Sequence, residues 1–171
     1  MKRFTFLLLF VASITMGAWA QKGMMGVGAH FGLHFGESVA AGGGVTFQYN
    51  LTDRLRLQPE ISGYGVDRIG INGIVLANIN WFFVSPRPLR PYLFFGLGYV
   101  NWEEETEYYN GYYNYYYTDV YDGIGVNAGI GLDWRLSHRL SLQAEFGGLG
   151  GFSGDDDLAV ARFSLGLTYN F

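Results

Sequence analysis

The last stretch of the chain, Ala161–Phe171, limits the possible folds more than any other part of the sequence. Its residues alternate strictly between two faces. The apolar face consists of Ala161, Phe163, Leu165, Leu167, Tyr169 and Phe171, and the polar face of Arg162, Ser164, Gly166, Thr168 and Asn170. A period of two predicts a β-strand with one apolar and one polar face. The length also fits a tilted strand that crosses a bilayer, which takes about nine to eleven residues.

The N-terminus has the features of a secretory signal peptide. Met1-Lys2-Arg3 is basic, Phe4–Met16 is apolar, and Ala18-Trp19-Ala20 has the small-x-small pattern of a cleavage site. The apolar run is shorter than the roughly twenty residues that a spanning helix requires, which disfavours an N-terminal membrane anchor. We therefore expect residues 1–20 to be removed and residues 21–171 to form one domain.

The same alternation recurs seven times before the terminal strand. The apolar faces of these predicted strands begin near Met25, Val45, Leu55, Val75, Leu93, Ile124 and Leu140. Short turns are predicted at 50–54, 84–91 and 136–139, and a turn at Glu37-Ser38 and longer polar loops at 64–72, 102–122 and 147–157. This arrangement is typical of a membrane barrel with short periplasmic turns and longer outside loops. Pro59 predicts a bulge in the third strand, because proline donates no ladder hydrogen bond.

The composition favours a membrane barrel over a soluble barrel of the lipocalin kind. Charged residues make up 15% of the chain, against roughly 25% in soluble domains. A soluble barrel would need a charged exterior, whereas the polar face here is mostly Gly, Ser, Thr, Asn and Gln. Apolar-face aromatics also gather beside the short turns and the C-terminus, as expected for a periplasmic girdle: Tyr49, Trp81, Phe83, Trp134, Tyr169 and Phe171.

The chain resembles the small outer-membrane β-barrels of the OmpA/OmpX type over residues 21–171. The resemblance rests on Arg90-Pro91-Tyr92 leading to Gly96–Tyr99, on Gly129–Asp133, and on the aromatic C-terminus. It implies an all-β, eight-stranded antiparallel up-and-down barrel, expected as a monomer in the outer membrane of a Gram-negative bacterium, among lipid and lipopolysaccharide. It also implies that Tyr169 and Phe171 belong to the signal read by the barrel-assembly machinery.

A small set of charges falls on the predicted inner face: Arg56, Glu60, Asp133, Arg135, Glu145 and Arg162. Eight strands leave an interior just wide enough for side chains to fill, and buried charges persist when they are paired. We therefore predict a salt-bridge network that plugs the lumen, in which Arg56 or Glu60 reaches toward Glu145. A narrow channel for ions or small solutes is the alternative, because the many inward glycines would leave room for a wet tunnel.

Metal, cofactor and nucleic-acid sites are not predicted. His30 and His34 share a face, but four strand residues separate them by about 13 Å, too far for one metal ion. The acidic segments Glu103–Glu107 and Asp155–Asp157 lack the spaced ligands of a calcium loop and are interpreted as solvated charge. A net charge of −4 and a pI near 5.2 disfavour nucleic acid. No His-x-Ser pairing resembles the motif of lipid A deacylases, so we expect no catalytic residues.

The most unusual segment is rich in tyrosine and lies in the predicted loop 102–122. Asn110-Gly111 is a strong hairpin signal, so we expect the flanking strands to continue beyond the membrane as a ribbon. The tyrosines of this ribbon are Tyr108, Tyr109, Tyr112, Tyr113, Tyr115, Tyr116 and Tyr117. Exposed tyrosine gives large, rigid contact area in binding loops. We therefore favour an adhesin-like site for a host or cell-surface ligand over a solvated low-complexity loop.

Overall fold

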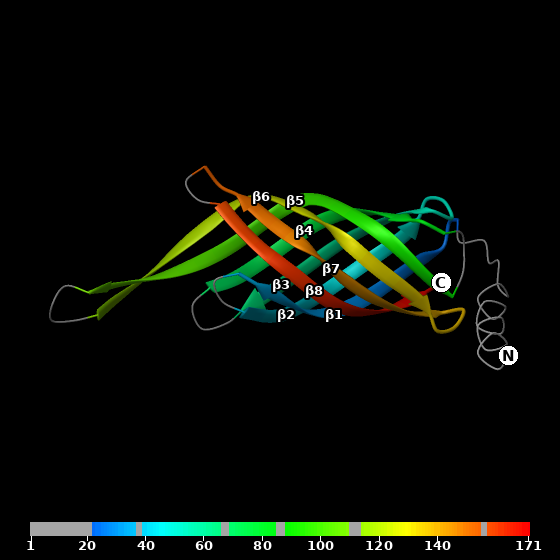
Figure 1. Cartoon of the computed structure of the whole chain (residues 1–171), viewed down its shortest axis with the longest axis horizontal. Coiled ribbons are helices and arrows are strands. Elements are labelled where there is room, and N and C mark those ends of the chain that lie inside the picture. Colours follow the sequence, from blue (N-terminus) through cyan, green and yellow to red (C-terminus); the bar gives the residue numbers. More distant parts are fainter. Residues whose placement is uncertain (1–21, 37–38, 66–68, 85–87, 110–113, 155–156) are drawn as a thin grey trace, which may run out of the picture.

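The computed structural model is a closed antiparallel β-barrel of eight strands (Figure 1). It describes residues 22–36, 39–65, 69–84, 88–109, 114–154 and 157–171, with 69, 70, 72, 104–109 and 114–117 described by their backbone alone. The strands are β1 (Met25–Phe35), β2 (Val39–Asn50), β3 (Leu55–Gly65), β4 (Ile69–Phe82), β5 (Leu89–Tyr109), β6 (Asn114–Arg135), β7 (Leu140–Phe152) and β8 (Asp157–Asn170). The predicted fold class is confirmed.

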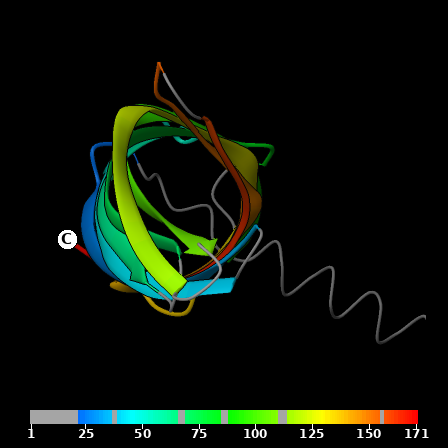
Figure 2. The ribbon, with the colours of Figure 1, turned by 90° about the vertical axis from the view of Figure 1, so that its left-hand side faces the viewer.

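Pairing between the first and last strands closes the sheet. The β1–β8 register runs from Gly26↔Asn170 to Phe35↔Ala161, and the view along the barrel shows the resulting ring (Figure 2). Closure pairs the backbone polar groups between strands, which is what a sheet needs in order to cross lipid. No helix in the described part of the chain is long and apolar enough to span a membrane. Residues 1–20, the predicted signal peptide, lie outside the described residues.

The two faces of the strands have opposite polarity. Outward side chains form an exposed apolar belt that includes Phe31, Ile61, Phe95, Ile130 and Leu165. The inward positions bury most of the polar residues, as the alternation predicts. The predicted aromatic girdle lies at the end of the barrel that holds Lys22 and the C-terminus, which we call the termini end (Figure 1). The opposite end, where β5 and β6 project, is called the ribbon end.

The strands at the ribbon end are longer than the sequence predicts. β3 continues to Gly65 and β4 begins at Ile69, so much of the predicted loop at 64–72 is strand. β7 reaches Phe152 and β8 begins at Asp157, so the predicted loop at 147–157 is wrong as well. Glycines and inward apolar side chains mask the alternation in these segments. The predicted turns at Glu37-Ser38 and Asn110-Gly111 lie outside the described residues.

The predicted bulge at Pro59 is also wrong. Pro59 pairs with Ala77 in the β3–β4 ladder, and the register shift of that ladder lies between Ser62 and Tyr64. In the β2–β3 ladder the register is the same before and after Pro59, from Thr46↔Glu60 to Tyr49↔Leu57. Pro59 therefore lacks a backbone N–H donor, but the strand contains no extra residue at this position.

Inward glycines make room for bulky side chains of the adjacent strand. A Cβ atom added at Gly131 would lie 2.2 Å from Cζ of Tyr92, and one at Gly129 would lie 2.6 Å from Cζ of Phe94. Both distances are shorter than any real contact of that kind. This close approach lets large rings lie flat inside a narrow barrel.

The register of β8 generates a labelling prediction. The chain has no cysteine, so single cysteines can be introduced without background. Phe163→Cys and Leu165→Cys should react with a thiol probe dissolved in lipid, whereas Ser164→Cys and Thr168→Cys should be protected, because the latter pair is buried in the lumen. A one-residue slip would turn Arg162 to lipid at a cost of about 2–4 kcal/mol. Labelling of the second pair alone would contradict the assigned register.

Candidate functional site

The lumen holds two separate groups of charged side chains. Most of the barrel's buried polar residues belong to its inner face, and the charged ones among them are Arg56, Glu60, Arg90, Asp133, Glu145 and Arg162. They come from strands on opposite walls of the ring, so contacts between them cross the lumen. We call Glu60, Glu145 and Arg162 the middle cluster, and Arg56, Arg90, Asp133 and Arg135 the arginine cluster.

Arg162 is the centre of the middle cluster. Its Nη2 lies 2.8 Å from Oε1 of Glu60 and 3.8 Å from Oε2 of Glu145, so one guanidinium from β8 faces carboxylates from β3 and β7. Ser62 donates a further hydrogen bond to Glu60 at 2.9 Å. The Arg162 side chain is 2% exposed, so these ion pairs are shielded from bulk water.

Glu145 is approached by uncharged donors from other strands. The hydroxyl of Tyr92 donates to its Oε1 at 2.7 Å, and Nε2 of Gln58 donates to the same atom at 3.3 Å. The sequence prediction that Arg56 or Glu60 reaches toward Glu145 is therefore wrong for Arg56, which binds Asp133 instead. Glu60 meets Glu145 indirectly, through Arg162.

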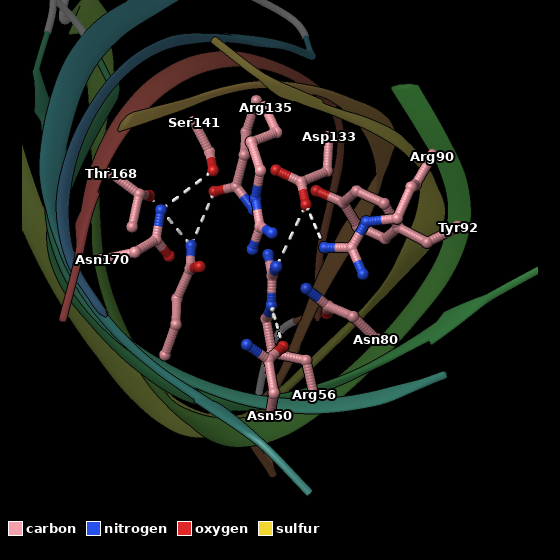
Figure 3. A network of polar contacts seen from close by, with 12 residues as sticks. Asn50, Arg56, Asn80, Arg90, Tyr92, Asp133, Arg135, Ser141, Thr168 and Asn170 are labelled. Carbon is pink, nitrogen blue, oxygen red and sulfur yellow. Dashed lines mark hydrogen bonds and ion pairs between the residues drawn. The ribbon is translucent and has the colours of Figure 1, made fainter. Parts of the chain in front are cut away.

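The arginine cluster, drawn in Figure 3, lies toward the termini end, where β3 and β5 begin and β6 ends. Arg56 donates from Nη2 to Oδ2 of Asp133 at 3.0 Å, and Arg90 donates to the same oxygen. Nε of Arg56 donates to Oδ1 of Asn50 at 2.9 Å. Arg135 is half-buried, and its Nη2 contacts the Met24 sulfur at 3.5 Å. Of the predicted lumen charges, Arg135 is thus the one nearest to solvent.

Several lumen residues are missing from the sequence prediction. Arg90 falls within the predicted turn 84–91, but β5 begins at Leu89 and places Arg90 on the inner face. Its guanidinium carbon lies 4.0 Å from the centre of the Phe82 ring, which also faces inward. The alternation itself could have identified Arg90 as inward. Arg90, Tyr92 and Phe94 have even numbers, as do Gly96 and Gly98 on the polar face of the same strand.

An apolar cap fills the lumen at the ribbon end. Its buried members are Ala40, Tyr64, Ile71, Ile74, Leu76, Val100, Trp102 and Leu149. Trp102 of β5 stacks on Tyr121 of β6, with ring centroids 5.8 Å apart. The sequence does not predict the cap, because inward and outward positions are both apolar in this region and the two-residue alternation is therefore not visible.

The histidines join the cap to the middle cluster. His34 stacks on Tyr64 with ring centroids 3.8 Å apart, and Nε2 of His30 lies 3.2 Å from the Tyr64 hydroxyl and 3.4 Å from Glu60. Within the described ranges no group of three or more His, Cys, Asp or Glu residues could hold a metal ion. We find no arrangement around these histidines that suggests metal binding.

The internal cavity of the middle lumen is small. Its walls include His30, Gln58, Glu60, Gln143 and Glu145, and about 10 Å³ is open to the centre of a water-sized sphere. A single water needs about 10–15 Å³ by this measure. The described side chains therefore leave room for roughly one water at this level.

Strands β5 and β6 leave the barrel as a two-stranded ribbon (Figure 1). They pair with each other as far as Tyr109↔Asn114, whereas β4 pairs with β5 only to Ile69↔Glu104 and β7 with β6 only to Ile124↔Phe152. Among the described residues, 105–109 and 114–123 therefore present unpaired strand edges. The predicted continuation of these strands as a ribbon is confirmed for the backbone.

The ribbon tyrosines are only partly described. Tyr108, Tyr109, Tyr115, Tyr116 and Tyr117 belong to the paired strands, with Tyr108 opposite Tyr115. Tyr112 and Tyr113 lie outside the described residues. At the base of the ribbon Val120 is 60% exposed.

The C-terminal aromatic residues sit at the termini end. Tyr169 and Phe171 are exposed on the outer face, and Phe171 exchanges backbone hydrogen bonds with Met25 of β1 at 2.9 and 3.2 Å. The last residue therefore completes the β1–β8 seam. Its predicted role in assembly stays a prediction.

Comparison with known proteins agrees with this geometry. A family model described as "Outer membrane protein beta-barrel domain" matches residues 5–171. No curated protein matches the sequence. The N-terminal barrel domain of OprF from Pseudomonas aeruginosa is 19% identical, with a TM-score of 0.66 over 90% of this chain and 100% of that one.

Two further solved barrels are similar in fold. Neisserial surface protein A is 14% identical, with a TM-score of 0.64 over 86% of this chain and 96% of that one. Ail, the attachment invasion locus protein of Yersinia pestis, is 14% identical, with a TM-score of 0.52 over 88% of this chain and 99% of that one. At these identities the likeness concerns the fold.

The middle cluster generates a stability prediction. Arg162→Met keeps a long side chain but leaves Glu60 and Glu145 buried without their counter-ion, which should lower the free energy of unfolding by about 3–5 kcal/mol. Urea unfolding in lipid vesicles, followed by tryptophan fluorescence, measures this change. The control is Arg139→Met, whose exposed guanidinium contacts Tyr169 at 3.1 Å and should matter by less than about 1 kcal/mol. Equal effects of both substitutions would contradict the assignment.

Proposed function

The chain belongs to the outer membrane protein beta-barrel domain family and is located in the bacterial outer membrane, and from this we propose that it is a closed support that presents the β5–β6 ribbon to a partner outside the cell. Short turns of such barrels face the periplasm and longer connections face outward. The termini end is then periplasmic and the ribbon end extracellular.

The projection of the ribbon is the observation that carries this proposal. β5 and β6 have 21 and 22 residues, whereas a tilted strand needs about nine to eleven to cross a bilayer. The excess pairs with no other described strand, so it contributes nothing to closing the barrel. Its base is held by Trp102, which is part of the apolar cap. The ribbon is thus a long, anchored projection that the barrel itself does not require.

The ribbon also supplies the kind of surface that binds proteins. Tyrosine offers large contact area with little side-chain entropy to lose, and seven tyrosines fall between positions 108 and 117. The unpaired edge of β6 could in addition accept an extended segment of a partner by backbone hydrogen bonding. Both features favour a protein ligand over a small solute.

The charge distribution indicates which partners fit. Apart from Asp53 and the lumen carboxylates, the acidic residues that the structure describes belong to the parts of β5, β6 and β8 toward the ribbon end, namely Glu103, Glu104, Glu105, Glu107, Asp119, Asp122 and Asp157. The described basic residues outside the lumen are at the termini end, namely Lys22, Arg54 and Arg139. Complementary charge speeds encounter and suppresses wrong partners. We therefore propose a basic protein surface as the ligand.

The alternative function, a narrow channel, has less support. A blocked ribbon end is supported by the buried cap, and a closed middle by the cavity beside Glu60 and Glu145, which has room for about one water. Conduction would require the middle and arginine clusters to separate, which would leave charges buried without partners.

Trimming the ribbon tests the proposal. Glu105 pairs directly with Thr118, so replacing residues 106–117 by Asn-Gly should close a two-residue hairpin without changing the register. We expect the trimmed protein to keep the heat-dependent gel mobility of a folded barrel and to lose binding to cells and extracellular matrix proteins. Unchanged binding would place the function elsewhere, and loss of folding would show that the ribbon is structural.

A matched variant separates side-chain recognition from the strand edge. Replacing the seven ribbon tyrosines by serine keeps the length and charge of the ribbon. This variant should lose most of the binding if the tyrosines provide the contact area, and should retain it if the β6 edge is sufficient.

A further inference from the structure

The arginine cluster contains more positive than negative charge. Arg56, Arg90 and Arg135 are gathered around one carboxylate, that of Asp133. The other lumen carboxylates, Glu60 and Glu145, face Arg162 in the middle cluster. Buried charge is stable when it is compensated, and among the described residues this cluster has no second anion to do so.

Its hydrogen-bond donors are also in excess. Nη1 of Arg56, Nε and Nη1 of Arg90, and Nε of Arg135 are buried and have no acceptor among the described residues. Both bonds to Asp133 end on the same oxygen, Oδ2. Oδ1 of Asp133 and Oδ1 of Asn80 are also buried without a partner, so four free donor atoms share this layer with two free acceptors. Guanidinium N–H groups cannot be removed by deprotonation in proteins, so these donors persist at every physiological pH.

The surrounding side chains hold two of the guanidinium groups in place. The Phe82 ring lies 4.8 Å from the guanidinium carbon of Arg56 and 4.0 Å from that of Arg90. Asn50 fixes Nε of Arg56. These contacts keep both groups in the lumen, so they cannot turn to solvent to satisfy their donors.

Arg135 connects this buried layer to the periplasmic mouth. It is half-buried, and its guanidinium points into the lumen toward that of Arg56 (Figure 3). Three guanidinium groups beside the single carboxylate of Asp133 leave the layer with excess positive charge, which a further anion would compensate.

We propose that the arginine cluster binds a small inorganic anion, for which chloride is the probe, between Arg135 and the Arg56–Arg90 pair. The anion accepts the free N–H groups and brings the charge of the layer closer to neutral. This site is at the opposite end of the barrel from the ribbon and does not depend on the proposed surface binding.

Line broadening of the chloride NMR signal tests the site. The protein is extracted from outer membranes in an uncharged detergent, and chloride is titrated at constant ionic strength with a large organic anion as balance. The wild type should show broadening that saturates and is reversed by bromide. Arg135→Gln, which breaks no ion pair among the described residues, should lose the saturable part. Arg139→Gln, which removes an exposed charge at the same end, should retain it.

Three outcomes would overturn the proposal. These are the absence of saturable broadening in the wild type, its persistence in Arg135→Gln, or an equal loss in both variants. Heat-dependent gel mobility checks that Arg135→Gln is folded. In a folded variant, a loss of the chloride line broadening cannot be assigned to unfolding. Crystals grown with bromide give an independent readout, and the anomalous peak should lie within hydrogen-bonding distance of Arg135 and of Arg56 or Arg90.

Discussion

The ion pairs of Arg162 with Glu60 and Glu145 set the conditions that the rest of this barrel must meet. Three strands, β3, β7 and β8, contribute one charge each, and these charges meet only when the sheet is closed in the observed register. A shift by one residue would turn every inward side chain to lipid. The same contacts that make the lumen stable therefore also specify which strands lie opposite each other.

This requirement explains the unusual composition of the inner face. Large rings such as those of Tyr92 and Phe94 point into a narrow interior, and glycines at the paired positions of the adjacent strand β6 make room for them. Gly131 admits the Tyr92 ring, whose hydroxyl then reaches Glu145. The lumen therefore holds a polar network toward the termini end and an apolar cap toward the ribbon end.

The sequence predicts the parts of the fold that alternate without interruption. The parity of β8, from Ala161 to Phe171, and the inward placement of Arg162 and Glu60 could be assigned because apolar and polar residues take strict turns. The extents of β3, β4, β7 and β8 could not, because Leu76, Leu149 and Ile74 are apolar yet face inward. Their burial depends on rings from distant strands that cap the lumen, and no local pattern records this.

The sequence also could not predict which lumen side chains form ion pairs and hydrogen bonds with each other. Arg56 and Glu145 lie on facing walls, but barrel stagger brings Arg56 to Asp133 and leaves Glu145 to Tyr92 and Gln58. Arg90 was hidden by its proline neighbours, which suggest a turn, although Pro91 is compatible with a strand near its first residue. The stagger between strands and the positions of the strand ends depend on the three-dimensional structure, and the alternation of apolar and polar residues does not predict them.

Conductance of the purified wild-type protein in planar lipid bilayers tests the central claim, a closed barrel that supports an outside ribbon. The packed clusters and the apolar cap predict a baseline indistinguishable from protein-free lipid, with a porin recorded under the same conditions as positive control. Steady, discrete openings that recur between preparations would show that the lumen conducts and would contradict the account.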